Sequence, residues 1–367
     1  MTVGFFSPLP PARTGVADYS AALLRALREF GEVKTNPNSA DVNLYHLGNN
    51  SLHGEIHRRA LQRPGVAVIH DAVLHHFYLG SLGKAEYVRE FAFNYGEWAA
   101  GFAEELWRER ARSATDPRYF RYPMLKRVVE ASLGVIVHNP AAAAMVRAHV
   151  PEARVFEIPH LFELRELPAP YETERLRAEL GCSGQTLLCG VFGHLRESKR
   201  IFTVIRAVQR ARSGRDVRLL IAGEFASRDL ARALEPELSR PGVIRVGYLP
   251  DEGFWRYAAA VDVCANLRYP AAGETSGIAI RLMGLGKPVI LTDGLETSRF
   301  PQSACLRADS GESEEEALLA HLLWLADARG DRLAIGSRAS EYIRKEHGLS
   351  HVAQEYWRVL GSCYHKN

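Results

Sequence analysis

The stretch AAGETSGIAIRLMGLGKPVI, residues 271–290, contains the pattern that decides the fold. It begins with a carboxylate, two hydroxyls and a glycine at 274–277, continues as a short apolar helix, and breaks at Gly286. After Pro288 it resumes as a β-rich run, which is typical of a buried strand. A loop, an apolar helix and an apolar strand in this order are one repeat of a sheet covered by helices. The stretch therefore predicts an α/β protein.

The same alternation of short apolar runs and helical stretches occurs in both halves of the chain. It predicts two doubly wound, Rossmann-like domains that face each other across a cleft, with ligands at the carboxyl ends of the strands. Strands are expected over 2–9, 41–48, 65–71, 134–139, 154–160, 186–193, 217–224, 243–249, 261–267, 287–293 and 304–309. Helical regions are expected over 15–30, 72–131, 200–212, 313–328 and 331–362.

A polar, proline-containing stretch at 161–184 separates the two halves and sets the expected domain boundaries. For 367 residues, two domains are the default expectation. The expected parts are an N-terminal domain over 1–165, a linker region over 166–184, a C-terminal domain over 185–343, and a last helix over 344–367. We expect this last helix to cross back to the N-terminal domain.

The composition is that of an ordinary soluble enzyme and argues against several classes of protein. Apolar residues make up 47% and charged residues 24% of the chain, and a net charge of +3 gives no argument for a nucleic-acid partner. Five cysteines without C-x-x-C spacing argue against a disulfide framework or a zinc cluster. The sequence begins without a signal-peptide pattern and has no apolar run long enough to span a bilayer, so we expect a cytoplasmic protein.

Glu274, Thr275, Ser276 and Gly277 follow one expected strand and precede a helix. Thr275 and Ser276 are good N-cap residues, and Gly277 allows a ligand to approach the backbone closely. The helix N-terminus suits a phosphate, whereas the carboxylate of Glu274 suits the hydroxyls of a sugar. Two interpretations stay open from this stretch alone: a clamp for a phosphosugar, and an N-cap box with a solvated glutamate.

A second stretch, VFGHLRESKR at 191–200, presents Arg196 and Lys199 after another expected strand of the same domain. Two cations beside a helix N-terminus can neutralise a leaving diphosphate without a metal. No D-x-D sequence occurs in the chain, so we expect no metal site. The other interpretation of the two cations is a solvated start of a helix.

Together these motifs resemble the family 4 retaining glycosyltransferases of the GT-B type, including members from bacterial polysaccharide biosynthesis. The segments that carry the resemblance are 7–27, 64–76, 192–200, 246–277 and 282–293. The resemblance implies transfer of a sugar from a UDP- or GDP-sugar to a hydroxyl of a glycan, a glycolipid or a small molecule. It also implies that the N-terminal domain, 1–165, binds the acceptor and that the C-terminal domain, 185–343, binds the donor. It implies no cofactor besides this donor substrate. A glycolipid acceptor would bring the protein to the inner face of a membrane.

The resemblance also implies which residues form the site. Arg196 and Lys199 match the paired phosphate-binding cations of the family. Glu274 matches the first carboxylate of the E-x7-E motif, which holds the transferred sugar, and His70 matches the histidine near the reacting carbon. Besides these four catalytic positions, donor contacts are expected at Gly15, Tyr248, Leu249, Thr275, Ser276, Gly277 and Ile278. Acceptor contacts are expected at Arg13, Asn49, Asp71 and His75.

One position departs from the family pattern. When the chain is aligned on GKPVI, Arg281 stands where the second glutamate of E-x7-E normally binds the ribose hydroxyls. An arginine cannot accept hydrogen bonds, although it can pair with Glu274 or with a phosphate. The alternative function is therefore a non-catalytic nucleotide-sugar-binding or scaffold protein on the same fold.

Overall fold

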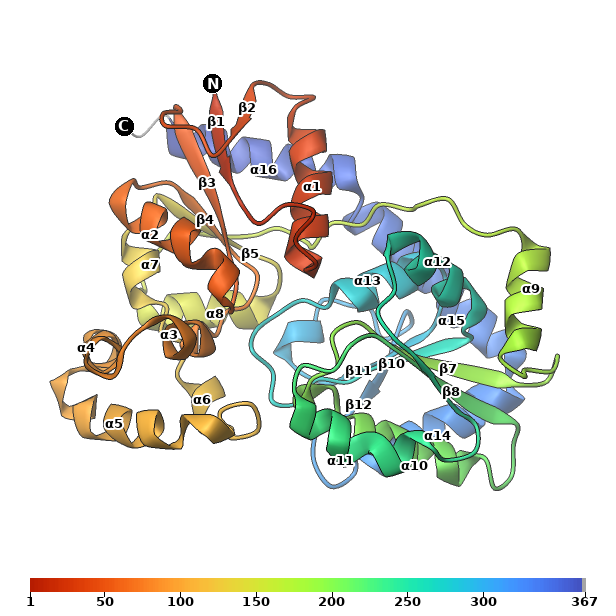
Figure 1. Cartoon of the computed structure of the whole chain (residues 1–367). Helices are drawn as coiled ribbons and strands as arrows, with labels where there is room; N and C mark the ends of the chain where they lie inside the picture. The colour runs from red at the N-terminus through yellow and green to blue at the C-terminus, as the bar shows by residue number, and fades with distance from the viewer. Residues whose placement is uncertain (365–367) are drawn as a thin grey trace. The chain divides into compact units, whose positions relative to one another are not determined.

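The structure is a computed structural model that describes residues 1–364 and divides into two compact units. Unit 1 comprises residues 1–161, 270–275 and the C-terminal segment from 347, and unit 2 comprises residues 162–269 and 276–346. Each unit contains one six-stranded sheet in which all neighbouring strands are parallel. Figure 1 shows these two sheets, each covered by its own helices.

The sheet of unit 1 has the strand order β2-β1-β3-β4-β5-β6. Apolar side chains of α1 (Gly15–Leu27) and α16 (Leu349–Tyr364) cover one face, and helices that connect β3 to β6 cover the other. Because both faces are covered, the central strands are continuous runs of buried residues. The strands are β1 (Val3–Phe6), β2 (Val33–Thr35), β3 (Val42–Leu47), β4 (Val66–Ile69), β5 (Gly134–Val137) and β6 (Val155–Glu157). The connecting helices are α2 (Gly54–Gln62), α3 (His75–Ser81), α4 (Lys84–Tyr95), α5 (Ala100–Glu109), α6 (Arg118–Arg121), α7 (Lys126–Glu130) and α8 (Pro140–His149).

Unit 2 repeats this design with the strand order β12-β11-β10-β7-β8-β9. Its core also forms on both faces of the sheet, with α10, α11 and α14 on one face and α12, α13 and α15 on the other. The strands are β7 (Leu187–Phe192), β8 (Val217–Ala222), β9 (Val243–Val246), β10 (Val263–Asn266), β11 (Val289–Thr292) and β12 (Leu306–Ala308). The helices are α9 (Pro170–Glu179), α10 (Ile201–Ala211), α11 (Arg228–Leu238), α12 (Asp251–Ala260), α13 (Gly277–Gly284), α14 (Glu314–Asp327) and α15 (Arg329–Glu346).

The boundaries of the units differ in part from those expected. The expected linker, 166–184, contains α9 and groups with unit 2, whereas the short segment 270–275 groups with unit 1. The helix expected over 331–362 is divided into α15 and α16. Strand β2 was not expected, because Lys34 and Thr35 are exposed and so give no apolar run. Within residues 1–364, no helix combines the length and the apolar character needed to cross a membrane.

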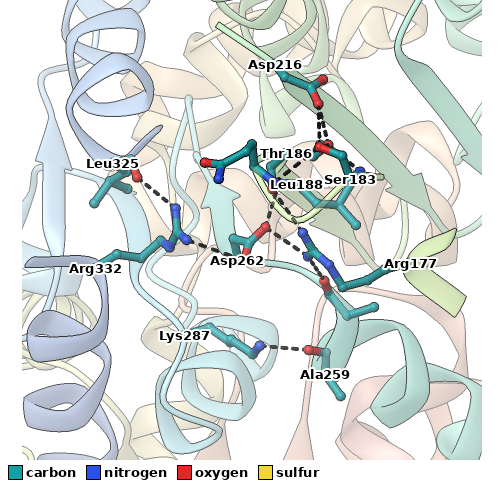
Figure 2. Close-up of polar contacts among 12 residues, drawn as sticks. Arg177, Ser183, Thr186, Leu188, Asp216, Ala259, Asp262, Lys287, Leu325 and Arg332 are labelled. Carbon is teal, nitrogen blue, oxygen red and sulfur yellow. Dashed lines mark hydrogen bonds and ion pairs between the residues drawn. The ribbon is translucent and has the colours of Figure 1, made fainter. Parts of the chain in front are cut away.

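A polar network at the amino ends of the strands explains why α9 belongs to unit 2 (Figure 2). Asp262, just before β10, accepts hydrogen bonds from Arg177 of α9 at 2.9 Å and from the backbone N–H of Leu188 at 2.8 Å. Arg332 approaches the same carboxylate at 3.9 Å, and Arg177 also donates to backbone carbonyls, including that of Thr186. Since a charge partly withdrawn from water is costly unless it is paired, these contacts hold α9 against the sheet.

Candidate active site

In unit 2, the structure brings a buried cation to the carboxyl end of β7. Lys199 is only 6% exposed, and its ammonium group donates to the carbonyl of Phe192, the last residue of β7. Gly193 follows with φ +86, and a Cβ atom there would lie 3.7 Å from Nζ of Lys199 and 3.4 Å from Ile278. The ammonium group and Ile278, in the first turn of α13, therefore both lie close to Gly193. Backbone N–H groups of a first helical turn have no partner within the helix. A cation beside a helix N-terminus suits an anion such as a phosphate.

The other basic residues of this loop have different surroundings. The Arg196 side chain is exposed at the start of the turn that contains Lys199. Arg200 is held in an ion pair with the buried Glu314 at 2.6 Å. The sequence did not separate these cations, because their burial depends on contacts with distant segments. Lys199 is thus a buried, fixed cation beside the end of β7, Arg200 is paired with Glu314, and Arg196 is exposed.

The remaining expected donor contacts of unit 2 lie at two further positions. Ser276 is the N-cap of α13, and its side chain accepts a hydrogen bond from the N–H of Ala279 at 3.3 Å. Tyr248 follows β9 and is 44% exposed, whereas Leu249 packs against the core of the unit. Ser276 therefore acts as the expected cap, and the backbone after β9 is accessible to a ligand.

Arg281, the departure from the family pattern, has a partner that the sequence did not reveal. Its guanidinium donates to Asp251, the first residue of α12, at 3.2 Å. Its Cζ atom also lies over the rings of Phe254 and Trp255, at 5.2 Å and 5.8 Å from the ring centroids. The arginine is therefore part of the packing between α13 and α12.

In unit 1, expected acceptor contacts form a polar network at the carboxyl ends of β3 and β4. The carboxylate of Asp71 accepts from the backbone N–H of Asn49 at 3.0 Å, and the Asn49 side chain accepts from the N–H of Phe77 at 2.7 Å. The side-chain amide of Asn49 also lies 3.4 Å from Nδ1 of His76, whose Nε2 bonds the carbonyl of Ser113. His76 was not predicted as a site residue.

The loop after β1 leaves a helix N-terminus open at the same edge of the sheet. Thr14 caps α1 by accepting from the N–H of Ala17 at 3.1 Å. Gly15 is exposed, and a Cβ atom placed there would meet no other atom within 4 Å. Arg13 is exposed just before the cap. These residues leave room for a ligand beside the start of α1.

His70 is nearly buried and belongs to a group of packed rings. It directly follows β4, its backbone N–H donates to the carbonyl of Leu47, and its side chain is 8% exposed. Nε2 of the ring lies 3.0 Å from Nδ1 of His46, and the ring packs edge-to-face on Tyr19. Burial, and then His138, His46 and other histidines, hold the pKa of His70 well below its usual range. The imidazole is therefore neutral at physiological pH.

His75 does not support the expected acceptor contact. Its side chain is fully buried, and Nε2 lies 2.7 Å from the hydroxyl of Tyr87 in α4. Burial lowers the pKa of His75 to about 3. The side chain packs in the core under α4, because the first turn of α3 points it toward the helices and away from solvent.

The segment that carries Glu274 is held within unit 1 by Asn139. The Asn139 amide donates to the carbonyl of Gly273 at 2.9 Å and to the hydroxyl of Thr275 at 3.0 Å. Its oxygen caps α8 by accepting from the N–H of Ala142 at 2.9 Å. Between these two contacts, Glu274 accepts from the N–H of Ala272 at 2.7 Å. Sequence analysis placed Asn139 at the end of a strand, and Pro140 after it was the signal for an N-cap.

Comparisons with known proteins agree with the expected family. Residues 186–326 match the family model described as "Glycosyl transferases group 1". Apart from the segment 270–275, the matched residues lie in unit 2. The matched region includes Lys199, Tyr248, Ser276 and the whole of α13, which are candidate donor contacts of unit 2. No curated protein matches the sequence.

Solved structures that resemble the chain show the fold. Sucrose-phosphate synthase from Thermosynechococcus elongatus superposes with a TM-score of 0.70 at 16% identity, covering 100% of both chains. HepE from Anabaena, in complex with UDP and glucose, gives 0.66 at 15% identity, covering 99% of this chain and 100% of that one. WaaG, a glycosyltransferase involved in lipopolysaccharide biosynthesis, gives a TM-score of 0.62 at 14% identity, covering 98% of this chain and 99% of that one. The expected GT-B fold with two Rossmann-like units is confirmed.

Proposed function

We propose that the protein is a retaining, metal-independent glycosyltransferase that moves a sugar from a nucleotide diphosphate to an acceptor hydroxyl. The observation that carries this proposal is the buried ammonium group of Lys199 beside the first turn of α13, inside the glycosyltransferase domain. A fixed positive charge at that place can stabilise the negative charge that grows on a leaving diphosphate. Complexes of HepE with UDP-glucose make UDP-sugars the first donors to test, with GDP-sugars next.

The roles of the other residues follow from the charges of the reaction. The transition state has positive charge on the sugar and negative charge on the diphosphate. Arg196 and the N–H groups of α13 assist Lys199 at the diphosphate, while Glu274 accepts hydrogen bonds from sugar hydroxyls. In a reaction on one face of the sugar, the leaving phosphate oxygen takes the proton of the acceptor, so no protein base is required. No cofactor is needed for this chemistry.

The acceptor is proposed to bind at the carboxyl ends of β1, β3 and β4 in unit 1. Asn49 and Asp71 form a connected polar network there, and Arg13 and Gly15 are exposed beside it. Carboxylate and amide groups of this kind suit a glycan hydroxyl. A glycolipid of a polysaccharide pathway is one such acceptor, and it would bring the protein to the cytoplasmic face of a membrane.

The experiment is a panel of nucleotide-sugars tested in excess EDTA. A true donor should raise the melting temperature by mass action, and an active enzyme should slowly release nucleoside diphosphate into water. Across residues 1–364, no group of three or more His, Cys, Asp or Glu side chains is arranged to hold a metal ion. A strict requirement for magnesium or manganese would contradict the metal-independent mechanism.

A second function, non-catalytic binding of a nucleotide-sugar, is favoured by one observation. Arg281 pairs with Asp251 and stands where the glycosyltransferase family that the chain resembles usually has a ribose-binding glutamate. Donor binding without hydrolysis or transfer would support this second function. Binding of none of the nucleotide-sugars would contradict both.

A further inference from the structure

We propose that His46 fixes the tautomer of His70, so that His70 presents Nδ1–H as a hydrogen-bond donor to the transferred sugar. This inference deepens the proposed function and rests on it. His46 lies inside β3 and His70 directly follows β4, and these two strands are neighbours in the sheet of unit 1. His46 is a positioning residue, since it is fully buried and acts through His70.

The two rings share one hydrogen bond. Nδ1 of His46 lies 3.0 Å from Nε2 of His70, and the rings stack with centroids 5.2 Å apart at an angle of 21°. In a neutral pair, one of these nitrogens carries the hydrogen and the other accepts it. Either His46 donates and His70 accepts, or His70 donates and His46 accepts. The second arrangement would leave His70 with an unprotonated Nδ1.

Two neighbouring histidines show how such rings are arranged in this core. Nδ1 of His53 lies 2.9 Å from the carbonyl of His46, and Nδ1 of His138 lies 2.9 Å from the carbonyl of Ile158. A carbonyl can only accept, so both histidines carry their hydrogen on Nδ1. Their Nε2 atoms are buried and lack a hydrogen-bond partner within the described part of the chain. Each therefore buries a lone pair and leaves no N–H group unsatisfied.

The same reasoning assigns the hydrogen of His46. Its Nε2 is also buried without a partner among residues 1–364. Buried N–H groups without an acceptor are rarer in proteins than buried acceptors without a donor. The hydrogen of His46 is therefore on Nδ1, which donates to Nε2 of His70. Burial, followed by His138 and His53, lowers the pKa of His46 far below its usual range, so the ring stays neutral.

This tautomer gives His70 one defined role. Nε2 accepts from His46, so the ring hydrogen of His70 must be on Nδ1. At Nδ1 the ring can then only donate a hydrogen bond to a sugar oxygen, and it cannot accept one there. Without His46, the neutral ring could carry its hydrogen on either nitrogen, and only part of the population would donate to the sugar.

The first test is nitrogen NMR of protein labelled with ¹⁵N-histidine. We expect the signals of His70 to show a protonated Nδ1 and an unprotonated Nε2, and we expect Nδ1 to shift when a nucleotide-sugar binds. His70→Gln assigns these signals. A protonated Nε2 in the wild-type protein would overturn the inference while leaving the transferase activity unaffected.

The second test uses three variants. His46→Leu removes the donor, so it should give His70 a mixed ¹⁵N pattern and lower kcat roughly tenfold or more. His46→Asn keeps an N–H group near the place of Nδ1, so it should restore the wild-type pattern and most of kcat. His53→Leu is the matched control, because it removes a buried histidine of the same group that bonds a backbone carbonyl and does not bond His70.

The outcomes of the two tests separate the inference from the proposed function. Equal losses of kcat in His46→Leu and His53→Leu, with unchanged His70 signals, would overturn the positioning role. The expected ¹⁵N pattern in a wild-type protein that neither hydrolyses nor transfers any donor would refute the transferase function, and with it the role at the sugar.

Discussion

The two parallel sheets have the same number of strands but place different polar groups around them. In unit 1, the buried polar groups at the carboxyl ends of the strands include three neutral histidines, of which His70 contacts both His46 and His138. In unit 2, the carboxyl end of β7 holds the ammonium group of Lys199, and a partly buried ion network around Asp262 lies at the amino ends.

Under the proposed function, this difference assigns two kinds of work to the two units. A diphosphate leaving group requires compensating charge, whereas a sugar requires hydrogen bonds with a defined direction. Neutral rings can be buried together without the large cost of desolvating an ion. The charges of unit 2 are stabilising only where a partner is present, as for Asp262 with Arg177.

Removing the charge at the end of β7 should give the largest loss of activity among the predicted changes. Lys199→Met should lower kcat/KM by about 10²- to 10³-fold, since a preorganised charge opposite the developing diphosphate is lost. It should also weaken binding of the free nucleoside diphosphate. The matched control is Lys345→Met, at an exposed lysine of α15 with 79% side-chain exposure. Wild-type kinetics in Lys199→Met would show that this cation does not serve the reaction.

The charges at the amino ends should affect stability and not activity. Lys287 donates to the carbonyl of Ala259 at 2.7 Å, and burial lowers its pKa from 10.5 to about 8. Between these two values the unfolded chain binds more protons than the folded one, so stability should rise with pH. The gain should be at most about 3 kcal/mol. Urea titrations from pH 7 to 10.5 measure it.

Lys287→Met should flatten this rise, because the group whose pKa is lowered is gone, while kcat at pH 7 should stay near its wild-type value. Lys345→Met again serves as the control, and it should keep the full pH dependence. An identical slope in Lys287→Met and wild type would assign the pH dependence to other groups.

Changing the carboxylate of Glu274 should distinguish contacts with the sugar from contacts with the diphosphate. Glu274→Gln should lower transfer roughly ten- to a hundredfold, since a neutral amide accepts hydrogen bonds from hydroxyls less strongly. Binding of the free nucleoside diphosphate should change little, as measured by calorimetry. Equal weakening of diphosphate and nucleotide-sugar binding would place Glu274 at the phosphates instead.

Loosening the segment that carries Glu274 should give the smallest change in activity among the predicted changes. Asn139→Ala removes the cap of α8 and two hydrogen bonds to Gly273 and Thr275, which should cost about 1–2 kcal/mol of stability. It should also raise KM for the donor severalfold. Asn139→Asp keeps the cap and loses the two donated bonds, so comparing the variants separates the two contributions. A raised KM in Asn139→Ala alone would assign the effect to α8.

The sequence by itself determined the α/β class, nearly all of the strands and the position of the helix that begins after Ser276. These features depend on residues close together in the chain, such as the six buried residues of β7. The family resemblance added the GT-B fold, which the structure confirms. Short exposed β2 was missed because its side chains carry no periodic signal.

Only the tertiary structure decided which polar side chains meet. The contact of His46 with His70 depends on the register of β3 on β4, and the contacts of Asn139 with Gly273 join residues 134 positions apart. The burial of Lys199, the exposure of Arg196 and the pairing of Arg281 with Asp251 likewise depend on which elements pack together. Local patterns determine elements, because propensity and periodicity act over a few residues. Burial and hydrogen bonding between distant residues arise only when these elements pack.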